Sequence, residues 1–223
     1  MSHTTLILPA AEAGQVQVGD ITVNRMGFGA MRITGYGVWG EPDNIDLCKQ
    51  VIKRAVELGV NFIDTADSYG PAVSERLLHD TLYPYKGVTI ATKGGMTRSG
   101  PHEWQVNAEP DHLREACKGS RQRLGLKQIP LYQLHRPDPK VPFEESVQTL
   151  VELKKQGKIK NIGLSNVSLE QLKQALELTP IASVQNHYNV MKRRESEAVL
   201  EFCEQNDIVF IPYFPMGGGM SDE

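Results

Sequence analysis

Apolar and polar positions alternate along the chain with two different periods, one typical of strands and one typical of helices. Near the start, Gln15–Val18 and Ile21–Val23 flank Gly19-Asp20, a pattern that predicts a β-hairpin. After the hairpin, short apolar runs rich in β-branched residues predict strands. These runs are Arg25–Met31, Val60–Thr65, Val88–Thr92, Pro130–His135, Ile159–Ser165, Ala182–Asn186 and Ile208–Tyr213.

Longer segments between these runs place apolar residues at helical spacing. They are Asn44–Leu58, Leu113–Leu124, Phe143–Gln156, Leu169–Leu178 and Glu195–Gln205. Strands that alternate with helices indicate βα units and a parallel sheet. The fold class predicted is therefore α/β, a TIM-type (β/α)8 barrel that lacks its last strand-helix unit and carries an N-terminal β-hairpin.

We expect a single barrel domain over residues 1–223. Within it, residues 1–24 form the N-terminal segment and hairpin, residues 25–215 form barrel strands one to seven with their helices, and residues 216–223 form a truncated tail. No linker or low-complexity segment interrupts this plan.

Composition narrows the function classes. The net charge is −3 with acidic and basic residues interspersed, which argues against a nucleic-acid partner. No apolar run is long enough for a membrane span, and the first residues do not resemble a secretory signal. The three cysteines stand apart, which argues against a zinc site or a disulfide framework. We expect a cytoplasmic protein with no bound metal; its oligomeric state cannot be predicted from this pattern.

Polar residues follow the predicted strands where their carboxyl ends would share one rim. Asp64 and Tyr69 follow the second strand, Lys93 ends the third and His135 ends the fourth. Each alone would be read as a turn, surface or loop residue. Together they suit general-acid chemistry, because an ammonium beside a tyrosine stabilises the tyrosinate left after proton donation. Asp64 would hold Lys93, and His135 would align a carbonyl oxygen.

Reduction of a carbonyl also requires a hydride source. Ser165, Asn166 and Gln185 offer hydroxyl and amide groups for a carboxamide, and Tyr213 offers a flat face for a planar ring. The glycine run that begins at Gly217 either approaches a phosphate through its backbone N–H groups or is a flexible tail.

Several segments carry a resemblance to a known family. They are Gly27–Met31, Asn61–Ala66 with Tyr69-Gly70, Ala91–Lys93, Leu134–Asp138, Gly157–Ile159, Gly163–Asn166 and Gln185–Asn189. From about Val16 onward the chain resembles the aldo-keto reductases.

The resemblance implies reduction of aldehydes or ketones by NADPH, with Tyr69 as the proton donor and Asp64, Lys93 and His135 as its catalytic partners. It implies that Ser165, Asn166 and Gln185 hold the nicotinamide carboxamide of NADP(H) and that Tyr213 stacks on the ring. We expect Met31 and Gly217 to contact the cofactor as well. The sequence departs from the family at Phe214, where many members have serine, and it lacks the family's adenosine-phosphate-binding segment beyond strand seven.

Two other interpretations stay open. The chain could be a non-catalytic aldo-keto-reductase-like scaffold or nucleotide-sensing subunit, or Lys93 could form a Schiff base in a barrel aldolase or lyase. For an enzyme, the partner is a small-molecule carbonyl substrate. Trp39 and Trp104 either wall the substrate pocket, favouring apolar or aromatic carbonyls, or pack their loops onto the barrel.

Overall fold

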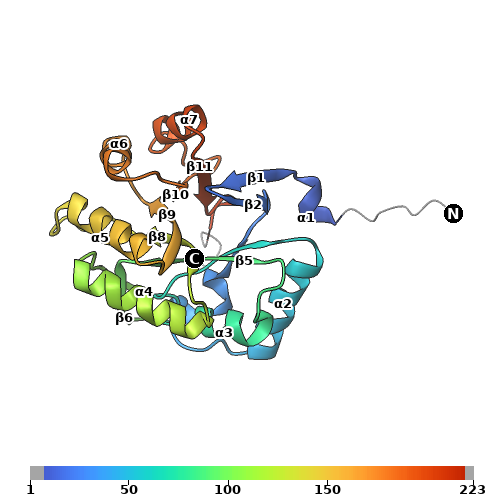
Figure 1. Ribbon diagram of the computed structural model, residues 1–223. Helices are drawn as coiled ribbons and strands as arrows, with labels where there is room; N and C mark the ends of the chain where they lie inside the picture. The colour runs from blue at the N-terminus through green and yellow to red at the C-terminus, as the bar shows by residue number, and fades with distance from the viewer. Residues whose placement is uncertain (1–7, 219–223) are drawn as a thin grey trace.

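A curved parallel sheet forms the centre of the molecule, in a computed structural model that describes residues 8–218. Its seven strands run in the order β11-β10-β9-β8-β5-β4-β3 (Figure 1). They are β3 (Phe28–Gly29), β4 (Phe62–Asp64), β5 (Thr89–Gly94), β8 (Ile129–Leu134), β9 (Ile159–Ser165), β10 (Ser183–His187) and β11 (Val209–Tyr213). Their spatial order follows chain order, and every neighbouring pair is parallel, so all carboxyl ends lie at the same rim.

Six helices cover the outer face of the sheet in an arc (Figure 1). They are α2 (Ile45–Glu57), α3 (Val73–Leu82), α4 (Pro110–Leu124), α5 (Phe143–Lys155), α6 (Leu169–Leu178) and α7 (Glu197–Gln205). Each packs against the next along the chain, and a buried apolar layer separates them from the strands. None of the helices within residues 8–218 has both the length and the hydrophobicity needed to cross a bilayer.

Local sequence explains where several helices begin and end. The Asn44 side chain accepts a hydrogen bond from the Leu47 amide at 2.9 Å and so caps α2. Ser168 and Gln171 form a reciprocal capping box at the start of α6. Gly125 ends α4 at a φ of 66°, a conformation that glycine adopts without steric penalty.

The predicted N-terminal hairpin is present as β1 (Gln15–Val18) and β2 (Ile21–Asn24). Val18 and Val23 are buried in one cluster with Phe62, from the amino end of β4. At the turn, Asp20 accepts a hydrogen bond from the Asn161 amide at 2.8 Å. The hairpin therefore closes the end of the sheet opposite the rim that carries the candidate site.

Three local predictions were wrong or incomplete. Only Phe28-Gly29 of the first predicted strand pairs with β4, because the chain turns at once into the 3-10 helix η1 (Ala30–Ile33). Helix α3 was not predicted, and neither was the short α1 (Pro9–Glu12). The long loop after β5 contains an antiparallel hairpin, β6 (Met96–Gly100) and β7 (Glu103–Val106).

Candidate active site

The four predicted catalytic side chains meet at the carboxyl rim. The Lys93 ammonium donates to Asp64 Oδ2 at 2.7 Å, to the Thr65 carbonyl at 2.9 Å and to the Tyr69 hydroxyl at 3.2 Å. The ring of His135 lies edge-on to that of Tyr69, with centroids 5.8 Å apart. The side chains that the sequence places on three strand ends therefore form one connected group.

Burial sets the protonation states of this group. Lys93 is 0% exposed, and although burial lowers its pKa, the ion pair with Asp64 and the contact with Tyr69 raise the pKa above its ordinary value. Lys93 therefore stays a charged ammonium. Burial raises the pKa of Tyr69, and the nearby Lys93 opposes that rise without cancelling it. Tyr69 consequently keeps its proton at neutral pH.

His135 is neutral at physiological pH. Burial lowers its pKa well below the ordinary value, and the charges of Lys93 and Arg136 lower it further. Its Nδ1 lies 3.4 Å from the hydroxyl of Ser68, a residue in the same loop as Tyr69. Ser68 was not predicted from the sequence, since a serine in a strand-end loop has no distinguishing pattern.

Gln133 also belongs to the site and was missed. Its side-chain amide donates to Asp64 Oδ1 at 2.9 Å, so both Asp64 oxygens are engaged, one by Lys93 and one by Gln133. Gln133 is 0% exposed on β8, and its own Oε1 has no partner among the described residues. A polar residue in an otherwise apolar strand was the available signal.

Asn166 is the centre of a second polar group beside His135. Its amide nitrogen donates to the His135 carbonyl and to the Ser165 hydroxyl, both at 3.0 Å. Its amide oxygen accepts from the Tyr213 hydroxyl at 2.7 Å and from Arg136 at 3.1 Å. The backbone φ of Asn166 is 59°, a left-handed conformation that asparagine tolerates better than most residues.

Gln185 and Tyr213 complete the predicted carboxamide set. Within residues 8–218, the side-chain amide of Gln185 has no hydrogen-bond partner, although the residue is only 4% exposed. A buried amide with free donor and acceptor groups fits a ligand carboxamide. The His187 ring stacks on Tyr213 at 5.0 Å and holds it in place.

The remaining predicted cofactor residues lie at the two ends of the barrel sequence. Met31 packs against the buried cluster of Val38, Ala66 and Tyr69. Gly217 has a φ of 97° and donates its N–H to the Phe214 carbonyl at 3.0 Å. The last glycine of the run, Gly219, lies outside the described residues.

The two tryptophans flank the catalytic group from separate loops. The ring of Trp104, on β7, lies edge-on to Tyr69 at 6.3 Å and to His135 at 6.4 Å. Trp39 follows the 3-10 helix η2 (Tyr36–Val38), and its backbone bridges to Gly70 beyond the catalytic tyrosine. Both indoles are half-buried.

A buried acidic pair lies behind the loop that carries Tyr69. Glu75 is fully buried, accepts from Arg123 at 2.6 Å and accepts from Thr92 at 2.6 Å. Asp67 Oδ1 is buried without a hydrogen-bond partner in the described part of the chain. Burial and the neighbouring Glu75 raise the pKa of Asp67 to about 8, so this carboxyl is protonated at neutral pH.

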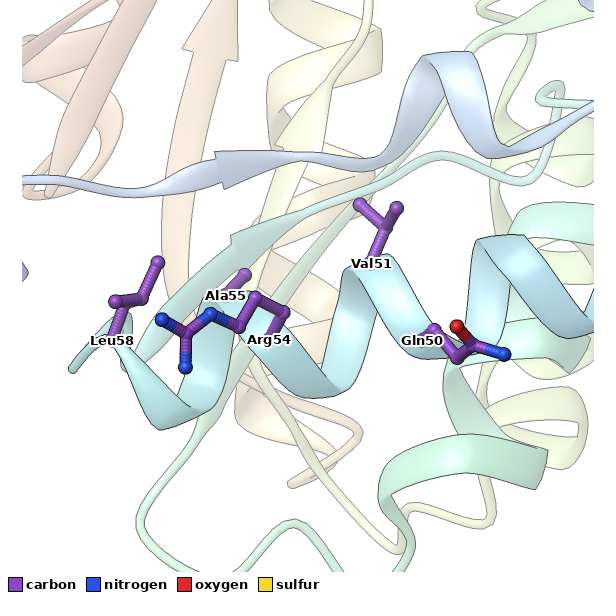
Figure 2. Close-up of a pocket in the computed structure, with 5 residues that line it drawn as sticks. All are labelled: Gln50, Val51, Arg54, Ala55 and Leu58. Carbon is purple, nitrogen blue, oxygen red and sulfur yellow. The ribbon is translucent and has the colours of Figure 1, made fainter.

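Two hollows on the described surface are lined by none of the predicted site residues. A shallow hollow of about 380 Å³ lies over the outer side of α2, and all of its lining residues belong to that helix or its cap (Figure 2). None of them is a predicted site residue. Across residues 8–218, no three His, Cys, Asp or Glu side chains gather as a metal site would require.

The fold and the site together define a barrel-type oxidoreductase. The family model described as "Aldo/keto reductase family" matches residues 25–223. The chain belongs to the aldo/keto reductase family, as its motifs predict.

Similar proteins span more residues than this chain. It is 53% identical to an uncharacterised oxidoreductase of Schizosaccharomyces pombe, over 94% of this chain and 68% of that protein. It is 36% identical to pyridoxine 4-dehydrogenase of Escherichia coli, over 90% of this chain and 72% of that protein. The solved structure of a glycerol dehydrogenase from Gluconobacter oxydans matches with a TM-score of 0.82 and 31% identity, over 90% of this chain and 63% of that one. The predicted fold class is thus confirmed.

Proposed function

We propose that this protein reduces an aldehyde or ketone to an alcohol, with hydride from NADPH and a proton from Tyr69. One observation carries the proposal: Lys93 Nζ lies 3.2 Å from the Tyr69 hydroxyl while paired with Asp64 at 2.7 Å. A buried ammonium beside a buried phenol has a clear chemical use, because it stabilises the phenolate as the proton leaves. The same charged state makes Lys93 unsuited to Schiff-base formation, which needs a neutral amine.

Each side chain of the group has a distinct task. Tyr69 O–H donates its proton to the carbonyl oxygen as that oxygen becomes an alkoxide. Lys93 balances the negative charge that the transfer leaves on Tyr69, and Asp64 keeps Lys93 charged and directed at the hydroxyl. Asp64 is itself held by Gln133. The reaction thus adds one hydride to carbon and one proton to oxygen.

His135 orients the carbonyl group. A neutral imidazole carries one N–H, and which nitrogen bears it depends on its partners. The Ser68 hydroxyl, 3.4 Å from Nδ1, is placed to donate to that nitrogen. The proton then resides on Nε2, which donates a hydrogen bond to the substrate oxygen. Trp39 and Trp104 border the space in front of these groups and favour apolar or aromatic carbonyls.

The residues beside the catalytic group suit a nicotinamide cofactor. The family uses NADP(H), which when bound supplies the hydride. Gln185 has a free amide, and with Ser165 and Asn166 it would hold the carboxamide edge. Tyr213 would stack on the ring. Met31 and Gly217 are proposed as further contacts of the cofactor.

Two relatives support carbonyl–alcohol chemistry through their names. The Escherichia coli relative is named as a pyridoxine dehydrogenase and the Gluconobacter oxydans structure as a glycerol dehydrogenase. Alcohol oxidation is the reverse of the proposed reduction, and by microscopic reversibility it uses the same groups.

Turnover of NADPH with a panel of alkyl and aryl aldehydes tests the proposal. Tyr69→Phe is expected to lower kcat by about 10²- to 10⁴-fold, the usual contribution of a general acid. Tyr83→Phe is the matched control, because it makes the same chemical change on a side chain that is 55% exposed and outside the site. Wild-type turnover by Tyr69→Phe would rule out Tyr69 as the acid.

The same samples distinguish the proposed enzyme from a non-catalytic subunit. Fluorescence titration with NADPH measures cofactor binding independently of turnover. Saturable binding by the wild-type chain, with no oxidation of NADPH by any aldehyde, would favour the nucleotide-sensing interpretation. Binding together with turnover that depends on Tyr69 supports the enzyme.

A further inference from the structure

Arg98 occupies an unusual position on the β6–β7 hairpin. Its guanidinium lies 3.7 Å from the centroid of the Trp104 ring and 5.9 Å from that of Trp39. Arg98 and Trp104 are directly opposed in the register of the two strands. One cation therefore contacts both tryptophans of the protein.

Every N–H of the Arg98 guanidinium has a backbone acceptor. Nε donates to the Glu103 carbonyl at 2.9 Å. Nη1 donates to Val38 at 2.6 Å and to Ser68 at 3.3 Å, and Nη2 donates to Gly37 at 2.7 Å and to Gly100 at 3.1 Å. No carboxylate in the described residues pairs with it. A guanidinium with all five donors used cannot also grip a substrate carboxylate.

These acceptors lie on three segments that are separate in sequence. Gly37 and Val38 belong to η2, and Ser68 belongs to the loop that carries Tyr69. Gly100 and Glu103 belong to the β6–β7 hairpin. The hairpin approaches η2 so closely that a Cβ at Gly37 would lie 2.7 Å from Pro101. Arg98 thus fastens together the three segments that surround the front of the catalytic group.

The contacts of Arg98 also fix the side chain of Trp104. Its indole has the Arg98 cation against one face and meets Tyr69 and His135 edge-on. A cation over an indole face is attractive, and the attraction grows as the pair is shielded from water. The indole is therefore held in one orientation beside the reacting atoms, as a preformed apolar wall.

We propose that Arg98 is a specificity-determining positioning residue, which fixes Trp104 and Trp39 as the walls of a pocket for neutral aromatic aldehydes. The substrate part of this inference rests on the proposed reductase function. The positioning part rests on the contacts of Arg98 alone. Arg98 touches neither the reacting atoms nor the proton donor, so its loss should change substrate preference more than the chemical step.

Fluorescence tests the positioning directly, because the sequence contains two tryptophans. In a Trp39→Phe background, Trp104 is the remaining emitter. Adding Arg98→Met should shift its emission to longer wavelength and raise its quenching by acrylamide. Arg54→Met is the matched control, since that arginine lies on α2 in an exposed pair with Glu57. Unchanged emission and quenching in the Arg98 variant would overturn the proposal.

Kinetics test the specificity. For benzaldehyde, Arg98→Met should raise KM by about fivefold, the equivalent of one cation–π contact. For propanal, the rise in KM should be clearly smaller than for benzaldehyde, and the pH profile of kcat should match that of the wild type. Equal losses for both aldehydes, or a changed pH profile, would mean that Arg98 acts through overall structure or through the chemistry, and the proposal would fail.

Two further measurements keep the test decisive. If Arg98→Met melts at a much lower temperature than wild type, Arg98→Lys replaces it: lysine keeps the charge but not the planar set of five donors, and should still loosen Trp104. If the chain turns over no aldehyde, 4-nitrobenzaldehyde quenching of Trp104 measures binding without turnover. Binding weakened by about fivefold on loss of Arg98 supports the pocket, and equal binding refutes it whatever the fate of the reductase proposal.

Discussion

The Lys93–Asp64 ion pair should contribute separately to stability and to catalysis. Lys93 is completely buried, and its ammonium donates to Asp64, to the Thr65 carbonyl and to Tyr69. Lys93→Met keeps the length of the side chain and removes the charge. Asp64 then keeps one neutral donor, the amide of Gln133 at 2.9 Å.

The expected loss of stability follows from the carboxylate left behind. Removing one partner of a buried ion pair costs about 3–5 kcal/mol, because the other charge stays desolvated and unpaired. The Asp64 side chain is 15% exposed, which favours the lower end of that range. At about 2–4 °C per kcal/mol for a chain of this size, Tm should fall by roughly 6–20 °C.

Asp64→Asn in the Lys93→Met background should recover at least half of that loss, since no buried charge is then left unpaired. Turnover should not recover. Without an ammonium beside Tyr69, burial alone governs the phenol, its pKa rises further, and kcat should stay about 10²- to 10³-fold below wild type. The double variant should therefore regain stability but not turnover.

Thermal melting by circular dichroism and NADPH oxidation are measured on the wild type, the two single variants and the double variant. If the double variant melts no higher than Lys93→Met, the argument from the unpaired carboxylate is wrong. If turnover returns together with stability, Lys93 acts only as a structural residue.

Three further predictions concern neighbours of the site. Gly163→Ala would place a Cβ 2.5 Å from the Ser183 hydroxyl oxygen and 2.8 Å from Gln133 Cγ. It should therefore lower the free energy of unfolding by about 1–3 kcal/mol. Adding Ser183→Ala should restore part of the loss, as measured by thermal melting. Asp67 has a pKa raised from 3.8 to about 8, so native stability should decline as pH rises across that interval. The Tm advantage of Asp67→Asn should therefore grow up to about pH 8 and then level off, and a constant difference would contradict it. Ser68→Ala should lower kcat/KM about fivefold through loss of one hydrogen bond, with Tm unchanged; unaltered kinetics would remove Ser68 from the site.

Strand and helix alternation was readable from the sequence because the buried sheet and its outer helices impose different periods. Helix α3 was not predicted because it begins at Val73, directly after the loop that carries Tyr69, and its N-cap residue Ala72 offers no capping side chain. The β6–β7 hairpin was not predicted because its strands are short and partly exposed, and its turn places His102 at a positive φ. Their conformations depend on contacts made after folding, which local propensity does not record.

The catalytic group was accessible to sequence reasoning for a related physical reason. Parallel strands bring their carboxyl ends to one rim, so the sequence alone predicts that Asp64, Lys93 and His135 lie together. Arg98 and Ser68 could not, because their roles depend on which carbonyls or ring atoms a loop happens to face. Charge and residue type alone do not distinguish Arg98 from an ordinary surface arginine.

The hairpin at the closed end of the sheet also determines when the molecule can be completed. Asp20 bonds to Asn161, which lies 141 positions later in the chain. At synthesis rates of about 5–20 residues per second, that partner emerges from the ribosome roughly 7–28 s after the hairpin. During this interval the packing of Val18 and Val23 stays incomplete, because Ala182 of the same buried cluster is made still later than Asn161. The nascent chain is therefore most prone to misassociation at its first strands, and this early-made hairpin completes its docking late.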